Sequence, residues 1–117
     1  MYNDSMYSKE LIKGTLTTII LKLLSHNEKM YGYEITQRVK IITDGKIVFK
    51  EGSLYPALHK LKDDGLIKTE KEVVNNRVRK YYSLTEKGRR STTEKVDELE
   101  SFISAIRNVL VYKPETT

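Results

Sequence analysis

Residues 51–67 read "EGSLYPALHKLKDDGLI" and predict a short amphipathic helix. Leu54, Ala57, Leu58 and Leu61 form its continuous apolar stripe. Ser53 is expected to be the N-cap, and Pro56 to lie in the first turn, where its missing N–H breaks no helical hydrogen bond. Gly65 predicts the end of the helix. The solvent side then combines Ser53, Tyr55, Pro56, His59, Lys60 and Lys62. This outer face raises the question of what the helix binds.

Two further helices are expected before this one. Residues 9–25 contain eight leucines and isoleucines, more than one helix face can hold, so the first helix should be buried on more than one side. The second begins at Tyr31, and its apolar face consists of Ile35, Val39 and Ile42. Its opposite face consists of Tyr33, Gln37 and Lys40. Both helices therefore have an apolar side that a common core can bury.

The remaining elements are predicted to be strands. Asp44 and Gly45 indicate a turn, and the β-branched and aromatic residues 47–49 indicate a short strand. After Gly65 two strand-like stretches, "LIKTEKEV" and "RVRKYYSL", flank Asn75 and Asn76, which tolerate the left-handed conformation of a tight turn. The order helix, helix, short strand, helix, hairpin predicts a winged helix-turn-helix, with a basic wing tip at Arg77, Arg79 and Lys80.

The C-terminal part predicts a long helix with an apolar seam. Val96, Leu99, Ile103, Ile106 and Leu110 follow a 3-4-3-4 spacing, and Phe102 and Val109 widen the stripe. Two heptads are too few for a free-standing coiled coil. The seam should therefore pack on the first helix, on the same helix of a second chain, or on both.

Composition and charge restrict the class of function. The 117 residues suit one domain, and they include no cysteine and only two histidines, far apart in sequence. Residues 50–90 hold eleven Lys or Arg against six Asp or Glu, so the whole net charge of +5 lies there. Such an excess fits either a surface that faces a polyanion or a solvated basic surface. A metal site, a cofactor or a catalytic centre is not expected, because no ligand cluster or phosphate-binding glycine loop is present.

The sequence also predicts the cellular location and the domain limits. No signal-like N-terminus and no membrane-length apolar run is present, so a cytoplasmic protein without membrane contact is expected. We expect a flexible arm at residues 1–8, a winged-helix domain at 9–85, a C-terminal dimerisation helix at 86–112 and a tail at 113–117.

Four stretches together carry a family resemblance: "KGTLTTIILKLLS", "YGYEI", "GSLYPALHKLKDDGLI" and "RKYYSLTEKG". In this order and spacing they resemble the PadR family of bacterial transcriptional regulators, over about two-thirds of the 117 residues. The resemblance implies a mainly α fold with a small β-hairpin (α+β). It also implies a homodimer that binds pseudo-palindromic operator DNA and usually represses, often released by a small molecule or a stress signal. Short members of the family have a single trailing helix, as here.

The resemblance also assigns site residues. The expected DNA contacts are Tyr33, Gln37, Lys40, Ser53, Tyr55, His59, Lys60, Lys62, Arg77, Arg79 and Lys80. The apolar seam and the doubly apolar first helix themselves give the expected dimer interface, which consists of Leu16, Ile20, Val96, Leu99, Phe102, Ile103, Ile106 and Leu110. An effector would lie near Leu99 and Phe102, although short relatives that stack planar drugs have an aromatic residue where Leu99 stands.

Simpler readings stay open beside these assignments. Tyr55 could pack against a neighbouring helix, and His59 could be a solvated side chain. The chain could also be a winged-helix protein-interaction module that binds no specific DNA, because a fold alone does not assign a function. RNA binding is a third alternative, but no exposed aromatic surface on a sheet is evident.

Overall fold

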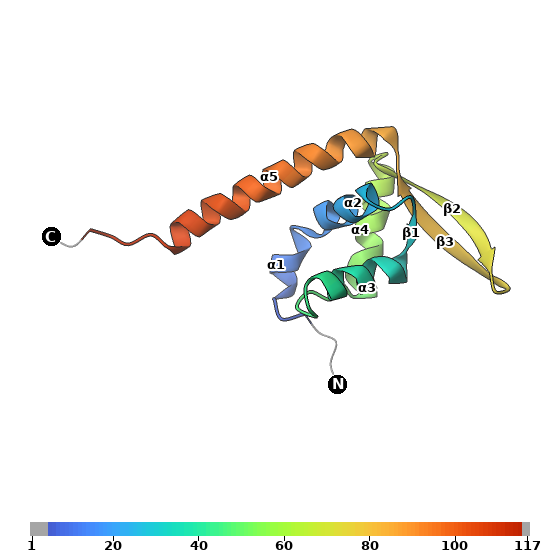
Figure 1. Ribbon diagram of the computed structural model, residues 1–117, viewed down its shortest axis with the longest axis horizontal. Helices are drawn as coiled ribbons and strands as arrows, with labels where there is room; N and C mark the ends of the chain where they lie inside the picture. Colours follow the sequence, from blue (N-terminus) through green and yellow to red (C-terminus); the bar gives the residue numbers. More distant parts are fainter. Residues whose placement is uncertain (1–4, 116–117) are drawn as a thin grey trace.

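The computed structural model describes residues 5–115 and consists of five helices and one antiparallel sheet (Figure 1). The elements are α1 (Lys9–Lys13), α2 (Leu16–Ser25), β1 (Met30–Tyr31), α3 (Gly32–Ile42), α4 (Glu51–Asp63), β2 (Ile67–Val74), β3 (Arg77–Leu84) and α5 (Glu86–Leu110). The strand order is β1-β3-β2. This is the predicted winged helix-turn-helix, with β2 and β3 as the wing.

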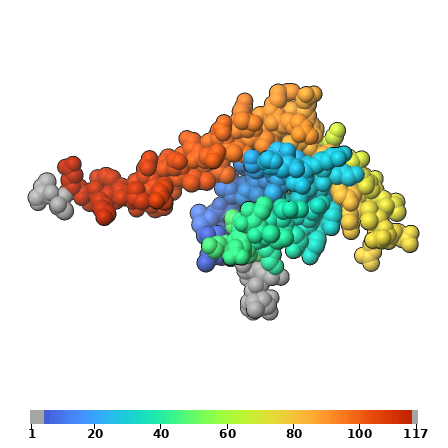
Figure 2. Space-filling model, viewed as in Figure 1, coloured from blue at the N-terminus to red at the C-terminus, as the bar shows by residue number. Residues whose placement is uncertain are grey.

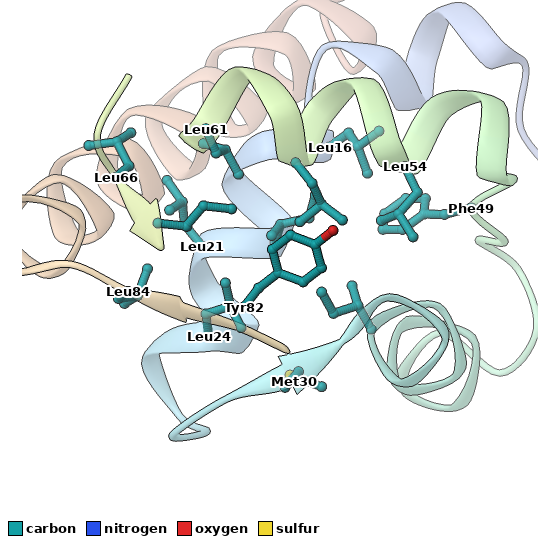
Figure 3. Close-up of a cluster of buried hydrophobic side chains, with 14 of the residues drawn as sticks. Leu16, Leu21, Leu24, Met30, Phe49, Leu54, Leu61, Leu66, Tyr82 and Leu84 are labelled. Atoms are coloured by element: carbon teal, nitrogen blue, oxygen red, sulfur yellow. The ribbon is translucent and has the colours of Figure 1, made fainter. Parts of the chain in front are cut away.

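A single core joins α2, α3 and α4 to the base of the sheet. Ile20, Leu21 and Leu24 of α2 are fully enclosed, and α4 contributes the predicted stripe of Leu54, Leu58 and Leu61. The Tyr82 ring projects from β3 into the centre of this cluster, above Met30 of β1 (Figure 3). The wing is therefore anchored to the helices by its C-terminal strand, while its tip extends away from them (Figure 1).

The predicted first helix is two helices. It breaks at Gly14, and Thr15 precedes a new start at Leu16. Glycine is a poor helix former, and the break lets α1 turn away, so α1 has no buried residue. The expectation of burial on two sides fits α2 alone, which contacts α4 and the sheet as well as α5.

Two local predictions around α3 were wrong. Ile42, expected on the buried face, is exposed at the last turn of the helix. Residues 47–49 are not a strand, although Phe49 is buried. The third strand is instead β1, which pairs Met30 with Tyr82 and Tyr31 with Tyr81. The free edge of β3 is thus occupied by a segment before α3, and the segment after α3 remains without a strand partner.

The loop that enters α4 is held by the start of the chain. The Ser5 hydroxyl donates to the Val48 carbonyl at 2.8 Å and accepts from the Val48 N–H at 2.6 Å. The Met6 N–H donates to the Lys46 carbonyl at 2.8 Å. Residues 1–4 of the predicted flexible arm lie outside the described residues, but Ser5 and Met6 are tied to this loop.

The wing has the predicted asparagine turn. Asn75 and Asn76 have φ values of 52° and 63°, as a two-residue hairpin turn of type I′ requires. The turn sets Val74 opposite Arg77, and the register continues without a bulge to Ile67 opposite Leu84. Because side chains alternate along a strand, this register decides which face of the wing each charge occupies.

The C-terminal helix α5 starts on the core and then leaves it. Thr85 caps its N-terminus by accepting from the Gly88 N–H at 3.0 Å, and the early turns pack on α2. Its distal half stands clear of the rest of the molecule (Figure 2). The Cα radius of gyration is accordingly 16.7 Å, whereas a compact chain of this length has about 13 Å.

Candidate nucleic-acid interface

The outward face of α4 consists of residues with small or polar side chains. Gly52, Pro56, His59 and Asp63 recur at helical spacing and are all exposed. A Cβ added at Gly52 would have no neighbour within 4 Å. The first half of this face therefore presents backbone, a proline ring and an imidazole, with no long side chain to hold a partner away. The sequence reasoning missed Gly52, although its spacing from Pro56 and His59 could have revealed it.

Two details of α4 correct the prediction. The helix begins at Glu51, because the Lys50 carbonyl accepts from both the Ser53 and Leu54 N–H groups, so Ser53 is inside the helix and is not its cap. Ser53 is half-buried beside a hollow of about 150 Å³ that it shares with Ser5, Tyr7 and Lys9. Pro56 lies in the second turn, where its missing N–H removes one helical bond to Gly52.

Tyr55, His59 and Lys62 face the wing across a hollow of about 510 Å³. The other residues that line this hollow are Tyr31, Gly32, Tyr33, Leu58, Thr69, Val78, Arg79, Lys80 and Tyr82. None of them is a carboxylate. The hollow is thus a polar, aromatic and basic surface formed by α3, α4 and the three strands of the sheet.

Tyr55 is partly a packing residue. Its hydroxyl oxygen would lie 2.6 Å from a Cβ on Gly32, so the phenol ring fills the space above the first residue of α3. Burial, and secondly the nearby Tyr55, raises the pKa of Tyr82 above its ordinary value of 10.0. Tyr55 is nevertheless 45% exposed. The ring therefore spaces α4 from α3 and leaves one edge for a partner.

The polar face of α3 lies beside the N-terminus of α4. Tyr33, Gln37 and Lys40 line a second hollow, of about 430 Å³, together with Lys50, Glu51 and Tyr55. The three side chains that the sequence placed on one helix face are thus brought next to the start of α4. Lys60, by contrast, lies on another side of α4 and pairs with Asp64 at 3.2 Å.

The three predicted wing cations have different surroundings. Arg77 adjoins the turn. The Arg79 guanidinium lies 4.1 Å from the centre of the Tyr31 ring, so Arg79 stacks at the base of the wing. Lys80 alternates with Arg79 along β3, and both residues line the hollow with His59 and Lys62. Lys71, which is not among the DNA contacts expected from the sequence, is directly opposite Lys80.

The predicted dimer residues divide into two groups. Leu16 and Ile20 are buried within the single chain, so they have no surface left for a partner. The α5 residues Phe102, Ile103, Ile106, Val109 and Leu110 are all exposed, and Val96 and Leu99 are half-buried nearer the core. Leu11 of α1 is also exposed. Among the predicted dimer residues, the exposed apolar side chains therefore belong to the distal half of α5.

Residues 5–115 contain no group of three or more His, Cys, Asp or Glu side chains that could hold a metal ion. None of the helices in this range is long and apolar enough to cross a membrane. The hollows on the two sides of α4 are lined by hydroxyls, an imidazole, the Gln37 amide, ammonium groups, a guanidinium group and the Glu51 carboxylate.

Comparison with known proteins agrees with the fold and identifies the family. Residues 20–94 match the model of the transcriptional regulator PadR-like family. An uncharacterised protein of Lysinibacillus sphaericus is 33% identical over 94 residues, which cover 80% of this chain and 85% of that protein. A transcriptional regulator from Clostridium thermocellum superposes with a TM-score of 0.78 at 35% identity, covering 89% of this chain and 100% of that one.

A more distant structure contains nucleic acid. Bacillus subtilis PadR in complex with operator DNA superposes with a TM-score of 0.60 at 24% identity, over 88% of this chain and 50% of that one. At this identity the likeness concerns the fold alone. The family match spans the core helices, α4, the wing and the start of α5, and family members are transcriptional regulators and not enzymes. The chain therefore belongs to the PadR-like family of transcriptional regulators.

Proposed function

We propose that this chain is a cytoplasmic, homodimeric repressor that places α4 in the major groove of operator DNA. The observation that carries the proposal is the pair of hollows that flank α4, one shared with α3 and one shared with the wing. Together the two hollows join α3, α4 and the wing into one surface, and these are the elements with which a winged helix binds DNA. Bacillus subtilis PadR, which has the same fold, is solved on operator DNA.

The roles of the residues follow from their positions. His59 and the glycine–proline half of α4 approach base edges, because a groove wide enough for a helix admits short side chains most closely. Near the N-terminus of α4, the sugar-phosphate backbone of the DNA is contacted by Tyr33, Gln37 and Lys40. Ser53 and Tyr55 lie beside them and contact the DNA as well. Lys60, Lys62 and Arg77 bind phosphates, which position the protein and make its affinity salt-dependent.

A second copy of the chain covers α5. The distal half of this 25-residue helix exposes five large apolar side chains, and a contiguous exposed apolar patch of this kind marks a protein-protein interface. The α5 helices of two chains, with Leu11 of α1 at the border, bury this surface about a two-fold axis. The two copies of α4 then lie about 34 Å apart, which predicts a pseudo-palindromic operator.

A small-molecule or stress signal would act at the same seam. Leu99 is half-buried and Phe102 is exposed, so a ligand between the two α5 helices contacts both. The chain has no tryptophan. An apolar ligand without a large planar ring is therefore the better fit to this seam.

Fluorescence anisotropy tests the proposal. A labelled duplex from the region upstream of the gene is titrated with the protein in a salt series, with unrelated DNA as competitor. Competitor-resistant binding by two chains per duplex is expected. Binding no stronger than to the competitor, both here and on duplexes selected from a random library, would favour the protein-interaction module instead.

The dimer is tested separately by Ile106→Asp, with Ser101→Asp as the control. Both positions are exposed on α5, but Ser101 is on the side of the helix away from the apolar seam. Ile106→Asp should sediment as a monomer and bind DNA more weakly, whereas Ser101→Asp should remain a dimer. A dimer in both variants would contradict the α5 interface.

A further inference from the structure

The two faces of the wing have different charge environments. One face contains Glu70, Glu72, Arg79 and Tyr81, and the other contains Thr69, Lys71, Val73, Val78 and Lys80. Tyr82 and Leu84 extend the second face into the core, and Thr69, Val78 and Lys80 of this face line the hollow beside α4, which Arg79 of the first face also borders. The second face is therefore the one that looks toward α4.

The face away from α4 is neutralised by contacts within the chain. Lys29, in the turn before β1, forms ion pairs with Glu70 at 3.7 Å and with Glu72. Its ammonium group also lies 4.9 Å from the centre of the Tyr81 ring, and Tyr81 meets Tyr31 edge-on at 5.7 Å. Arg79 covers the other side of this assembly by stacking on Tyr31. These groups fix the wing to the body of the protein.

The face toward α4 has the opposite character. Lys71 and Lys80 are directly opposite each other in the register, and like charges in this position destabilise a strand pair. Both are exposed, and neither has an ion-pair partner among residues 5–115. From α4 this face meets His59 and Lys62, and no carboxylate lines the hollow between them. Within the described part of the chain, the ammonium groups of Lys71 and Lys80 on this face therefore have no negatively charged group beside them.

One step farther toward the tip, Val73 and Val78 form an apolar pair. They are also directly opposite each other, and they are 72% and 69% exposed. Two large apolar side chains on the same exposed face as two unpaired lysines match a surface with alternating charge and apolar edges. The sugar-phosphate backbone of DNA is such a surface, since deoxyribose edges alternate with phosphates.

We propose that Lys71 and Lys80 together clasp one backbone phosphate of the DNA that α4 reads, with Val73 and Val78 against the adjoining sugars. Arg79 does not contact DNA; it is a positioning residue that holds the wing through Tyr31. The inference rests on the proposed function and adds detail to it: Lys71 joins the DNA contacts expected from the sequence, and Arg79, one of those expected contacts, becomes a positioning residue.

The salt dependence of DNA affinity tests the two faces of the wing separately. The probe is a duplex that the wild-type protein has selected from a random-sequence library, with the variants Lys71→Ala/Lys80→Ala, Lys68→Ala and Arg79→Ala. Lys68 is the matched control, because it is an exposed lysine of the same strand on the other face. Each lost phosphate contact flattens the slope of log affinity against log salt by about 0.9, so a dimer that loses two clasps should flatten by about two.

Lys68→Ala should leave the slope unchanged, and Arg79→Ala should weaken binding with little change of slope. Thermal unfolding of the double lysine variant should occur at the wild-type temperature or above it, because a repulsive pair is removed. Specific binding by the wild type with an unchanged slope in Lys71→Ala/Lys80→Ala would overturn the clasp and leave the proposed function standing. Equal flattening by Lys68→Ala would also overturn it. Absence of specific binding by the wild type would overturn the proposed function itself.

Discussion

Gly88 is the position where the joint between α5 and the wing is most sensitive to substitution. A Cβ at this residue would lie 2.0 Å from the Leu66 carbonyl oxygen, 3.0 Å from its carbon and 3.2 Å from Leu84 Cδ2. The nearest obstacle is backbone, which cannot rotate away as a side chain can. The same carbonyl accepts the Thr85 N–H at 3.1 Å. Gly88→Ala must therefore separate α5 from the base of the wing or break this hydrogen bond.

The expected cost follows from three contributions. Overpacking against a fixed neighbour costs about 1–3 kcal/mol, and the weakened hydrogen bond about 1 kcal/mol. The better helix propensity of alanine returns about 1 kcal/mol. The net loss is about 2 kcal/mol. At about 2.1 cal/mol/K per residue of unfolding entropy, it lowers the melting temperature by about 8 °C.

Circular dichroism at one fixed protein concentration measures this change, since the melting temperature of a dimer depends on concentration. Gly52→Ala is the matched control, because it also replaces a helical glycine but meets open space. It should melt at the wild-type temperature or a few degrees higher. If the Gly88→Ala and Gly52→Ala variants had the same melting temperature, the close contact between α5 and Leu66 would be disproved.

Three further predictions concern the site. Gly32→Ala should destabilise the fold by about 1–3 kcal/mol because its Cβ meets the Tyr55 hydroxyl, and Tyr55→Phe in the same chain should recover part of the loss in a double-mutant cycle of urea unfolding. Gly52→Ala should keep or raise stability yet weaken binding to selected DNA, if a methyl group on the outward face holds α4 away from the groove; unchanged affinity in anisotropy would contradict the close approach. Burial raises the pKa of Tyr82 above 10.0, so the unfolded chain releases this proton first as pH rises. The stabilisation from neutral Tyr82 is then complete below pH 10.0 and is lost as pH rises through the raised pKa, and Tyr82→Phe should flatten the alkaline fall in unfolding free energy; an equally steep fall would argue against the shift.

The sequence predicted correctly the elements that depend on residues close together in the chain. The stripe of Leu54, Leu58 and Leu61 identified α4, and the Asn75–Asn76 pair identified the hairpin. Residues 47–49 have equally strong strand propensity but found no partner, because β1 occupies the edge of β3. A two-residue strand leaves no periodic signal, so this competition was invisible in the sequence.

The site could be predicted to a similar extent. Helical spacing placed Tyr33, Gln37 and Lys40 on one face, and the structure puts that face beside α4. Arg79 was misplaced at the wing tip because its stacking on Tyr31 joins residues far apart in the chain. Lys71 could have been found: a two-residue turn that sets Val74 opposite Arg77 also sets Lys71 opposite Lys80.

The edge position of β2 has a consequence for solubility. Its eight residues leave a row of backbone N–H and C=O groups open on the side away from β3, and such a row can template pairing with another chain. Residues 68–72 read "KTEKE", so charged side chains project from both faces of this edge. A second strand docking here would have to strip water from them. The charges of the wing thus also protect the protein from edge-to-edge aggregation at the high local concentrations that chains reach during synthesis.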